Sequence, residues 1–311
     1  MIKTRILSTC LLLFMVAMTL SAQQQPSQIN PFSGVYIDQT IPGTTPKFFA
    51  EGFVNTPMDM HGNIVFTPDL KEAIWHPDEP KGLYISRNVE GVWSTPEEIS
   101  FVSGFMHDAP CYSVDGKLLY FMAGAIGSSS KTENEKLYVV ERKGDTWTGA
   151  KILDTVFDSY SMHWQFSLDS KGNLYFGGNQ KGIEERSDIW YARYENNRYM
   201  TPVRLPETIN SENGEFSPCI APDESYIIFN RAVFEPEKPP VISLYISYKS
   251  PDGSWTESQS LDSVLHSKGH DLNAKISPDN KYLFFMRRLS AKSGTYWVST
   301  SVLDGLQPFK K

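Results

Sequence analysis

The sequence predicts an all-β fold, a five-bladed β-propeller built from four-stranded antiparallel blades. One phrase occurs five times: an alternating stretch leads to an Asp, a short polar turn follows, and an apolar run ends in an aromatic or other bulky residue. The repeated aspartates are Asp69, Asp115, Asp169, Asp223 and Asp279, spaced 46, 54, 54 and 56 residues apart. A period near fifty residues made only of short strands and turns is typical of propeller blades.

Within a repeat the strands follow one another in a fixed order. In the fourth repeat, residues 214–223 predict the innermost strand, 224–230 the second, 242–249 the third and 253–261 the fourth. An aromatic residue opens the fourth strand in four repeats: Trp93, Trp147, Tyr199 and Trp255. Because it recurs at one place in the pattern, we expect it to pack between blades.

The fifth repeat stops after its third strand. Residues 46–54 lie about as far before Asp69 as the preceding fourth strand lies before Asp115. We therefore expect this N-terminal segment to complete the last blade and close the ring, which removes open sheet edges. The predicted organisation is a signal peptide at 1–22, a linker or lead-in at 23–45, the propeller at 46–306 and a tail at 307–311.

The repeated aspartates are predicted to set turns. They stand between first and second strands, where an Asp side chain accepts a hydrogen bond from the amide two residues on. We expect this structural role for all five.

The N-terminus carries the features of an export signal. Lys3 and Arg5 precede an apolar run that ends at Leu20, and small residues follow, so cleavage is expected near Ala22. The apolar run is short for a membrane span. We expect a soluble periplasmic or secreted protein. The formal net charge of −7, without a basic run, disfavours nucleic acid as a partner.

Only Cys111 and Cys219 lie beyond the expected signal peptide. Both stand four residues before their repeat Asp, in blades that are not neighbours. We expect two buried thiols that act as small hydrophobic residues rather than a disulfide.

The phrases SPDNKYLFF, SVDGKLLYF and APDESYIIF resemble the WD40-like repeat known as PD40, found in TolB-type propellers and in many exported proteins of Bacteroidetes type. The resemblance covers all five repeats and implies a propeller in a single-domain exported protein. A TolB propeller has six blades and a helical domain ahead of it. The five repeats here depart from that pattern, so a role of the TolB kind is not implied, and the fold alone does not fix a function.

Loop lengths indicate which face carries a site. Connections after first and third strands are short and uniform, whereas those between second and third strands are long and unlike one another. Function is more often found on long, individual loops over a rigid frame. A binding surface is therefore expected on the long-loop face, at the channel mouth.

Polar residues recur eight, six and four positions before the repeat Asp, and strand alternation would place them on one side, facing the channel. The predicted ligand-binding residues at this mouth are His61, His107, His163, Glu215, Asp271, Arg231 and Arg287. Three interpretations stay open. The polar groups simply face water, they bind a polar ligand such as a sugar or carboxylate, or the three histidines hold a metal with Glu215 or Asp271.

Catalysis is a further hypothesis. Some five-bladed propellers are glycoside hydrolases with paired carboxylates around the channel, and Glu215, Asp271 and Asp108 are the candidates here, with Asp59 in reserve. No hydrolase motif surrounds them.

The favoured function is a non-catalytic, cofactor-free propeller that binds a polar small molecule, a glycan or a protein. The alternatives are a carbohydrate-active enzyme and a structural component of an envelope assembly.

Overall fold

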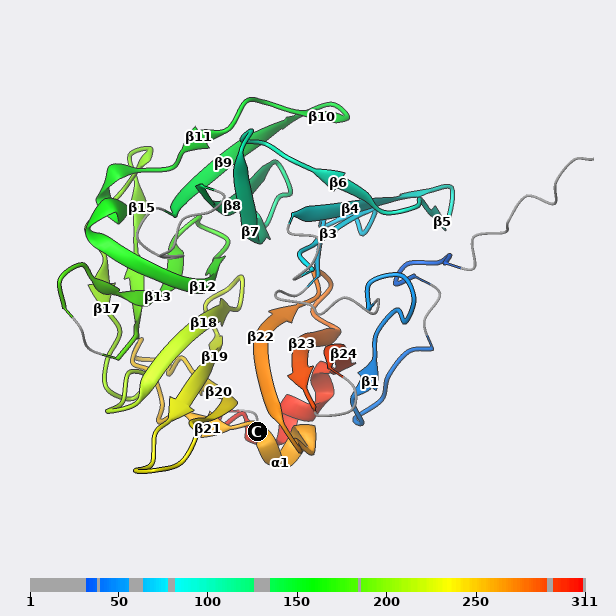
Figure 1. Ribbon diagram of the computed structural model, residues 1–311. Helices are drawn as coiled ribbons and strands as arrows, with labels where there is room; N and C mark the ends of the chain where they lie inside the picture. The colour runs from blue at the N-terminus through cyan, green and yellow to red at the C-terminus, as the bar shows by residue number, and fades with distance from the viewer. Residues whose placement is uncertain are drawn as a thin grey trace, which may run out of the picture.

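Five small antiparallel sheets stand in a ring around a central axis, as the sequence predicts (Figure 1). The computed structural model describes residues 32–37, 40–55, 64–77, 82–125, 135–183, 186–289 and 293–309, and for Ala125, His163 and Trp164 it describes the backbone alone. The first strands of blades 2 to 5, β7, β12, β18 and β22, lie nearest the middle of the ring. The five-bladed propeller is confirmed.

Each blade is a meander in which successive strands pair side by side. Blade 1 contains β2 (Val65–Phe66), β3 (Glu72–Trp75), β4 (Leu83–Val89), β5 (Val92–Trp93) and β6 (Glu97–Ile99). Blade 2 contains β7 (Phe105–Tyr112), β8 (Leu118–Ala125), β9 (Lys136–Lys143), β10 (Thr146–Trp147) and β11 (Lys151–Ile152). Blade 3 contains β12 (Tyr160–Leu168), β13 (Leu174–Gln180), β14 (Asp188–Ala192) and β17 (Val203–Arg204). Blade 4 contains β18 (Gly214–Ile220), β19 (Tyr226–Val233), β20 (Val241–Tyr248) and β21 (Gln259–Ser260). Blade 5 contains β22 (His270–Ile276), β23 (Tyr282–Arg288), β24 (Gly294–Ser299) and β1 (Lys47–Phe48).

The remaining elements are short. A hairpin of β15 (Tyr194–Glu195) and β16 (Arg198–Tyr199) extends from blade 3. The helical turns are η1 (Thr155–Ser159), α1 (Asp262–Leu265) and η2 (Thr300–Leu306). No helix within the described part of the chain has the length and apolar character that crossing a membrane requires.

The N-terminal strand closes the ring, as predicted. In β1, Lys47 pairs with Trp297 and Phe48 with Tyr296 of β24. The Asn55 amide adds two buried hydrogen bonds to this junction: its Nδ2 donates to Thr295 O and its Oδ1 accepts from Thr295 N, both at 2.8 Å. The last blade thus combines both ends of the propeller.

The described part of the predicted linker packs against the junction of blades 5 and 1. Tyr36 is buried with Phe66 of blade 1 and with Tyr282 and Trp297 of blade 5. Its hydroxyl donates to Asp279 Oδ1 at 2.8 Å. Gly34 O accepts a bond from the indole of Trp93. This segment therefore adds apolar and polar contacts to the seam where the ring closes.

The repeated aspartates all accept a hydrogen bond from the amide two residues on, at 2.9 to 3.2 Å. Blade 3 reaches this geometry in a different way. Its paired residues Leu168 and Leu174 enclose a turn one residue shorter than that between Tyr112 and Leu119. Asp169 directly follows the last paired residue of its first strand, as Ser113 does in blade 2. Alignment of the five repeats by their aspartates therefore shifts the first strand of blade 3 by two residues relative to the others.

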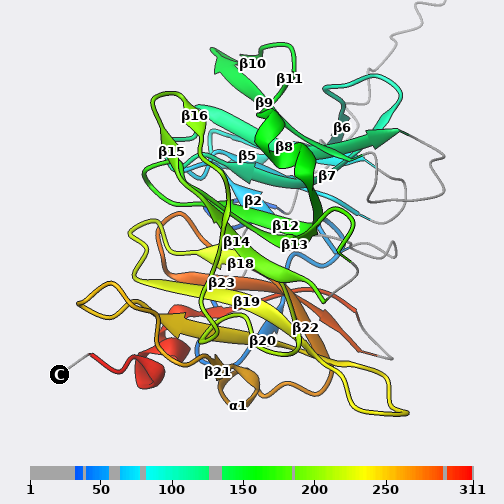
Figure 2. The same ribbon diagram turned by 90° about the vertical axis from the view of Figure 1, so that its left-hand side faces the viewer.

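The two faces of the ring differ. Hairpin β15–β16 and the C-terminal segment lie on one side, and the β19–β20 connection lies on the other (Figure 2). The turns after the first strands belong to the former side, which we call the Asp-turn face. The opposite side is the long-loop face, part of which lies outside the described residues.

Candidate functional site

β-Bulges in the first strands decide which side chains reach the channel. The pairing register shifts within β7, β12, β18 and β22. In three of these bulges one residue has a positive φ: Ala109 at 49°, Ser217 at 50° and Asn273 at 56°. Because extra residues interrupt the alternation of side chains, positions before and after a bulge no longer share one side. The single polar face expected from the sequence does not form.

Glu215, expected at the channel mouth, is fully buried in an ion pair. Its Oε1 accepts from Arg231 Nε at 2.7 Å and from Ser211 Oγ at 2.6 Å. Arg231 lies opposite it on β19 and also donates to Ile209 O at 2.9 Å. Burial raises the pKa of Glu215, and the bonds from Ser211 and Arg231 offset part of that increase. The pair ties the sheet to the segment that enters blade 4.

Blade 5 repeats this arrangement with Asp271 and Arg287. The carboxylate is fully buried and receives two bonds from Arg287, from Nε at 2.6 Å and from Nη2 at 2.7 Å. The same guanidinium donates to Leu265 O at 3.0 Å. Burial also raises the pKa of Asp271, against the effect of Arg287. Both acid–arginine pairs therefore hold the connections between blades, and Arg287 binds its carboxylate in the two-pronged geometry typical of guanidiniums, whereas Arg231 binds Glu215 through Nε alone.

In blade 2 a histidine takes the same place. His107 is buried, and its Nε2 accepts from Val102 N at 3.0 Å and from Phe101 N at 3.2 Å. Its ring lies 5.3 Å from that of Phe121. An unprotonated Nε2 is needed to accept both bonds. Here a neutral imidazole, in place of an ion pair, ties the sheet to the connection between blades 1 and 2.

Acidification is expected to weaken the fold through His107. Burial lowers its pKa below the ordinary 6.5, so the unfolded chain binds a proton more readily than the folded protein. The stabilising contribution is present above that ordinary pKa and is lost as the pH falls toward the lower folded value. We expect thermal melts to show a larger loss of Tm on acidification for wild type than for His107→Gln, whose amide oxygen can accept the same donors. Equal losses would contradict this.

The remaining predicted residues divide into two groups. Asp108 is partly exposed, and its Oδ1 lies 3.6 Å from His76 Nδ1. His61, Asp59 and the side chain of His163 lie outside what the structure describes. Among the residues that it does describe, no group of three His, Cys, Asp or Glu side chains is arranged to hold a metal.

A pocket of about 160 Å³ occupies the centre of the ring and opens at the Asp-turn face. Turn residues form its rim: Pro68, Ser113, Val114, Pro222 and Pro278. Deeper in the ring, the first strand of each blade contributes one residue at an equivalent position. In each blade this residue pairs with the second-strand residue that directly precedes the aromatic residue ending the repeated phrase. These five positions are Val65, Cys111, Ser167, Cys219 and Lys275. When the repeats are aligned by their aspartates, Gln165 is the residue of blade 3 at this position. The turn of blade 3 is shorter, however, and the structure places Ser167 there instead.

Of the described residues that line this pocket, Lys275 is the one cation, and it crosses the channel. It comes from blade 5, and its Nζ donates to Phe166 O of blade 3 at 3.0 Å. The residue is 8% exposed. Among the described residues, Phe166 O is the hydrogen-bond acceptor of the ammonium, and no carboxylate lies within ion-pair distance of it. A buried ammonium without a counter-ion is costly in free energy.

The two thiols line the same pocket from blades 2 and 4, and both are buried and free, as expected. Burial raises the pKa of Cys111 and of Cys219, and the Lys275 ammonium offsets part of the increase in each. Thiols with raised pKa values are neutral near pH 7 and unreactive. They therefore provide no negative charge for Lys275.

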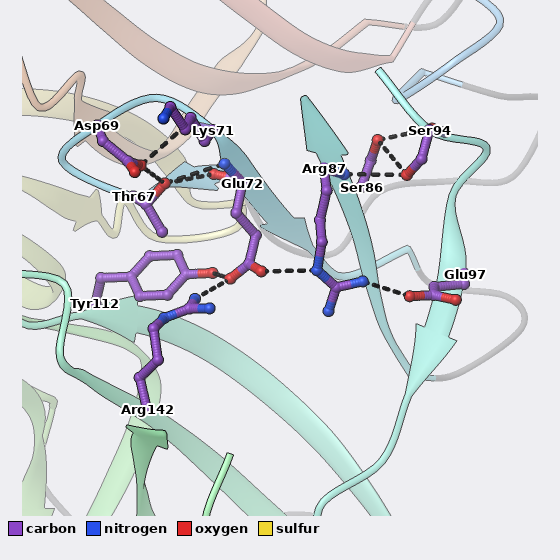
Figure 3. Close-up of polar contacts among 10 residues, drawn as sticks. All are labelled: Thr67, Asp69, Lys71, Glu72, Ser86, Arg87, Ser94, Glu97, Tyr112 and Arg142. Carbon is purple, nitrogen blue, oxygen red and sulfur yellow. Dashed lines mark hydrogen bonds and ion pairs between the residues drawn. The ribbon is translucent and has the colours of Figure 1, made fainter. Parts of the chain in front are cut away.

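A second hollow, of about 620 Å³, adjoins the central pocket at Pro68 and lies between blades 1 and 2. Its buried centre is Glu72, whose carboxylate accepts from Tyr112 Oη at 2.6 Å, from Arg87 Nε at 3.1 Å and from Arg142 Nη2 (Figure 3). Arg87 also donates to Glu97 at 2.6 Å. One buried carboxylate thus joins two guanidiniums from different blades, a contact that holds the blades together.

Sequence reasoning missed both Lys275 and Glu72 as important groups. A signal was available for each. Glu72 stands where the other repeats have Leu118, Asn173, Tyr226 and Tyr282, so it is the charged exception at a buried position. Lys275 is likewise the one charged residue four positions before a repeat Asp. A charged residue at a buried repeat position that is neutral in the other blades indicates that its charge has a specific binding partner.

Ring, blades and pocket together define the class: a five-bladed β-propeller with a small central pocket that contains a buried cation. No family model matches the chain, and no curated protein matches it. Solved structures do match. TolB from Acinetobacter baumannii is similar with a TM-score of 0.51 and 14% identity over 80% of this chain and 54% of that one. A putative TolB from Agrobacterium tumefaciens gives 0.52 and 15%, over 79% of each chain.

These likenesses support the fold alone, because the identities are low. The chain spans about half the length of the first of these structures. A family-43 glycoside hydrolase also matches, with a TM-score of 0.49 and 14% identity over 79% of this chain and 91% of that one. That likeness is too slight to bear on activity.

Proposed function

We propose that this chain is an exported, non-catalytic β-propeller that binds a small polar ligand in its central pocket. The observation that carries the proposal is Lys275, a buried ammonium that lines the pocket without a carboxylate partner among the described residues. Pockets with few, well-placed polar groups and apolar walls are the usual form of a ligand site. Export is inferred from Lys3, Arg5 and the apolar run that follows them.

The binding face differs from the one that loop lengths favoured. The central pocket opens at the Asp-turn face, whereas the long-loop face was expected to bind. Its volume of about 160 Å³ corresponds to roughly five water molecules. A small molecule therefore fits this pocket better than a glycan or a protein surface does.

The hydrolase alternative finds little support in its candidate carboxylates. A glycosidase needs two carboxyl groups that meet the substrate. Glu215 and Asp271 are fully buried and are already bound to Arg231 and Arg287. Their contacts support a structural role, which favours binding over catalysis.

A ligand screen with a blocked pocket tests the proposal. Mature protein from the periplasm or medium, expected to begin at Gln23, is tested by ligand-observed NMR against small carboxylates, amides and polyols. Val114 is exposed at the rim, so Val114→Trp should close the pocket and abolish binding. Val203→Trp, at an exposed position of β17, is the matched control and should retain binding. Absence of hits, or binding unchanged in Val114→Trp, would contradict the proposal and favour a structural role in an envelope assembly.

A further inference from the structure

Among the residues that the structure describes, Lys275 brings the one charge to the central pocket, and no carboxylate there balances it. The described groups that line the pocket beside Lys275 are neutral: the thiols of Cys111 and Cys219, the hydroxyls of Tyr112, Ser113, Ser167 and Ser277, the amide of Asn280, and apolar side chains. Burial keeps both thiols in their protonated form. A positive charge in an apolar pocket attracts an anion more strongly than it would in water, because the local dielectric screening is weak.

The ammonium also has hydrogen-bonding capacity left. It carries three N–H donors, and the described structure gives it one acceptor, Phe166 O. Nearby, Ser167 Oγ accepts from Ile220 N at 3.0 Å, which leaves its own O–H as a donor. Donors in excess of acceptors are the pattern expected of a site for an acceptor-only group such as a carboxylate.

The walls of the pocket decide what the anion is attached to. They are formed largely by aliphatic and aromatic side chains: Ile64, Phe66, Ile220, Ile276 and Phe284. A strongly hydrated inorganic anion would lose its water against such walls without enough donors to replace it. A carboxylate on an apolar body gains from both parts of the pocket.

We propose that the central pocket binds a small monocarboxylate with an apolar body, with the carboxylate beside Lys275 and the body against the apolar walls. This inference rests on the proposed function, since it names the ligand class of the same pocket. The volume of about 160 Å³ suits a short aliphatic or a single-ring aromatic acid.

Calorimetric titration with matched probes tests the charge requirement. Butyrate and benzoate are compared with butyramide and benzamide, which have the same shape without the charge, and with inorganic phosphate. Wild type should bind the two acids at least about 10-fold more tightly than the amides, and Lys275→Met should lose that preference, as expected when one partner of a buried charge pair is removed. Lys281→Met, an exposed lysine of the same blade, should behave as wild type.

The stability of the ligand-free variant gives a second, independent measurement. If the ammonium awaits a ligand, Lys275→Met removes a buried unbalanced charge and should raise Tm; a purely structural lysine would give a lower Tm, which would overturn the inference. Acids and amides binding equally, or phosphate binding more tightly than the acids, would also overturn it and leave pocket binding intact. If none of the probes binds, this inference fails, whereas the proposed function is contradicted only if the wider ligand screen, which includes polyols, also gives no hits.

Discussion

Glu72→Gln is expected to lower the free energy of unfolding by about 3 kcal/mol, because it removes one partner of a buried charge cluster. Glu72 is 4% exposed, and its carboxylate lies between Arg87 and Arg142. A neutral amide would leave these two guanidiniums facing each other without the charge that holds them together. Urea unfolding, followed by tryptophan fluorescence and far-UV circular dichroism, measures the change.

Glu97→Gln is the matched control, since Glu97 binds the same Arg87 but its side chain is 61% exposed. An exposed pair contributes less than about 1 kcal/mol. Adding Arg142→Gln to Glu72→Gln removes one of the opposed cations and should recover part of the lost stability. Equal losses for the two glutamate variants would show that burial of Glu72 does not matter.

Asp271→Asn is expected to destabilise the propeller by about 3 kcal/mol or more, because it leaves Arg287 buried without its counter-ion. Asp271 is fully buried and Arg287 also holds Leu265 O of the segment that enters blade 5. Loss of the ion pair should therefore loosen the connection between blades 4 and 5 as well as the sheet. Equilibrium unfolding gives the total effect, and hydrogen exchange of residues 261–269 reports the local one.

Asp188→Asn provides the comparison for Asp271→Asn. Asp188 also receives two bonds from one arginine, Arg204, at 2.6 and 3.0 Å, but Arg204 is half-exposed. The expected loss is below about 1 kcal/mol. If Asp271→Asn instead left stability unchanged and abolished ligand binding, the ligand-binding role that the sequence suggested for Asp271 would be supported.

The fold was predictable because it depends on a pattern that repeats. Five copies of one phrase specify the blades, and the missing fourth strand after Tyr296 pointed to the segment around Lys47 as its replacement. Local turn chemistry at the repeated aspartates and the apolar ends of the second strands agree with that arrangement. When local turn chemistry, hydrophobic pattern and repeat spacing all indicate the same arrangement, the topology can be predicted from the sequence.

The site was harder to predict because it depends on departures from the pattern. Simple alternation placed Glu215 and Asp271 at the channel, but the bulges at Ser217 and Asn273 change the direction of every side chain before them. A bulge leaves little trace in one sequence, although Asn is common at positive φ. The shortened turn at Asp169 similarly displaced blade 3 by two positions.

Because β1 pairs with β24, one of the first segments to be synthesised is among the last to find its partner strand. Lys47 is made early, yet its partner Trp297 is added roughly 250 residues later. Until then the last sheet lacks its outer strand, and Tyr36 can pack on Phe66 of blade 1 but not on Tyr282 and Trp297 of blade 5. A nascent chain therefore cannot close the ring blade by blade, because β1 can pair only after β24 has been made.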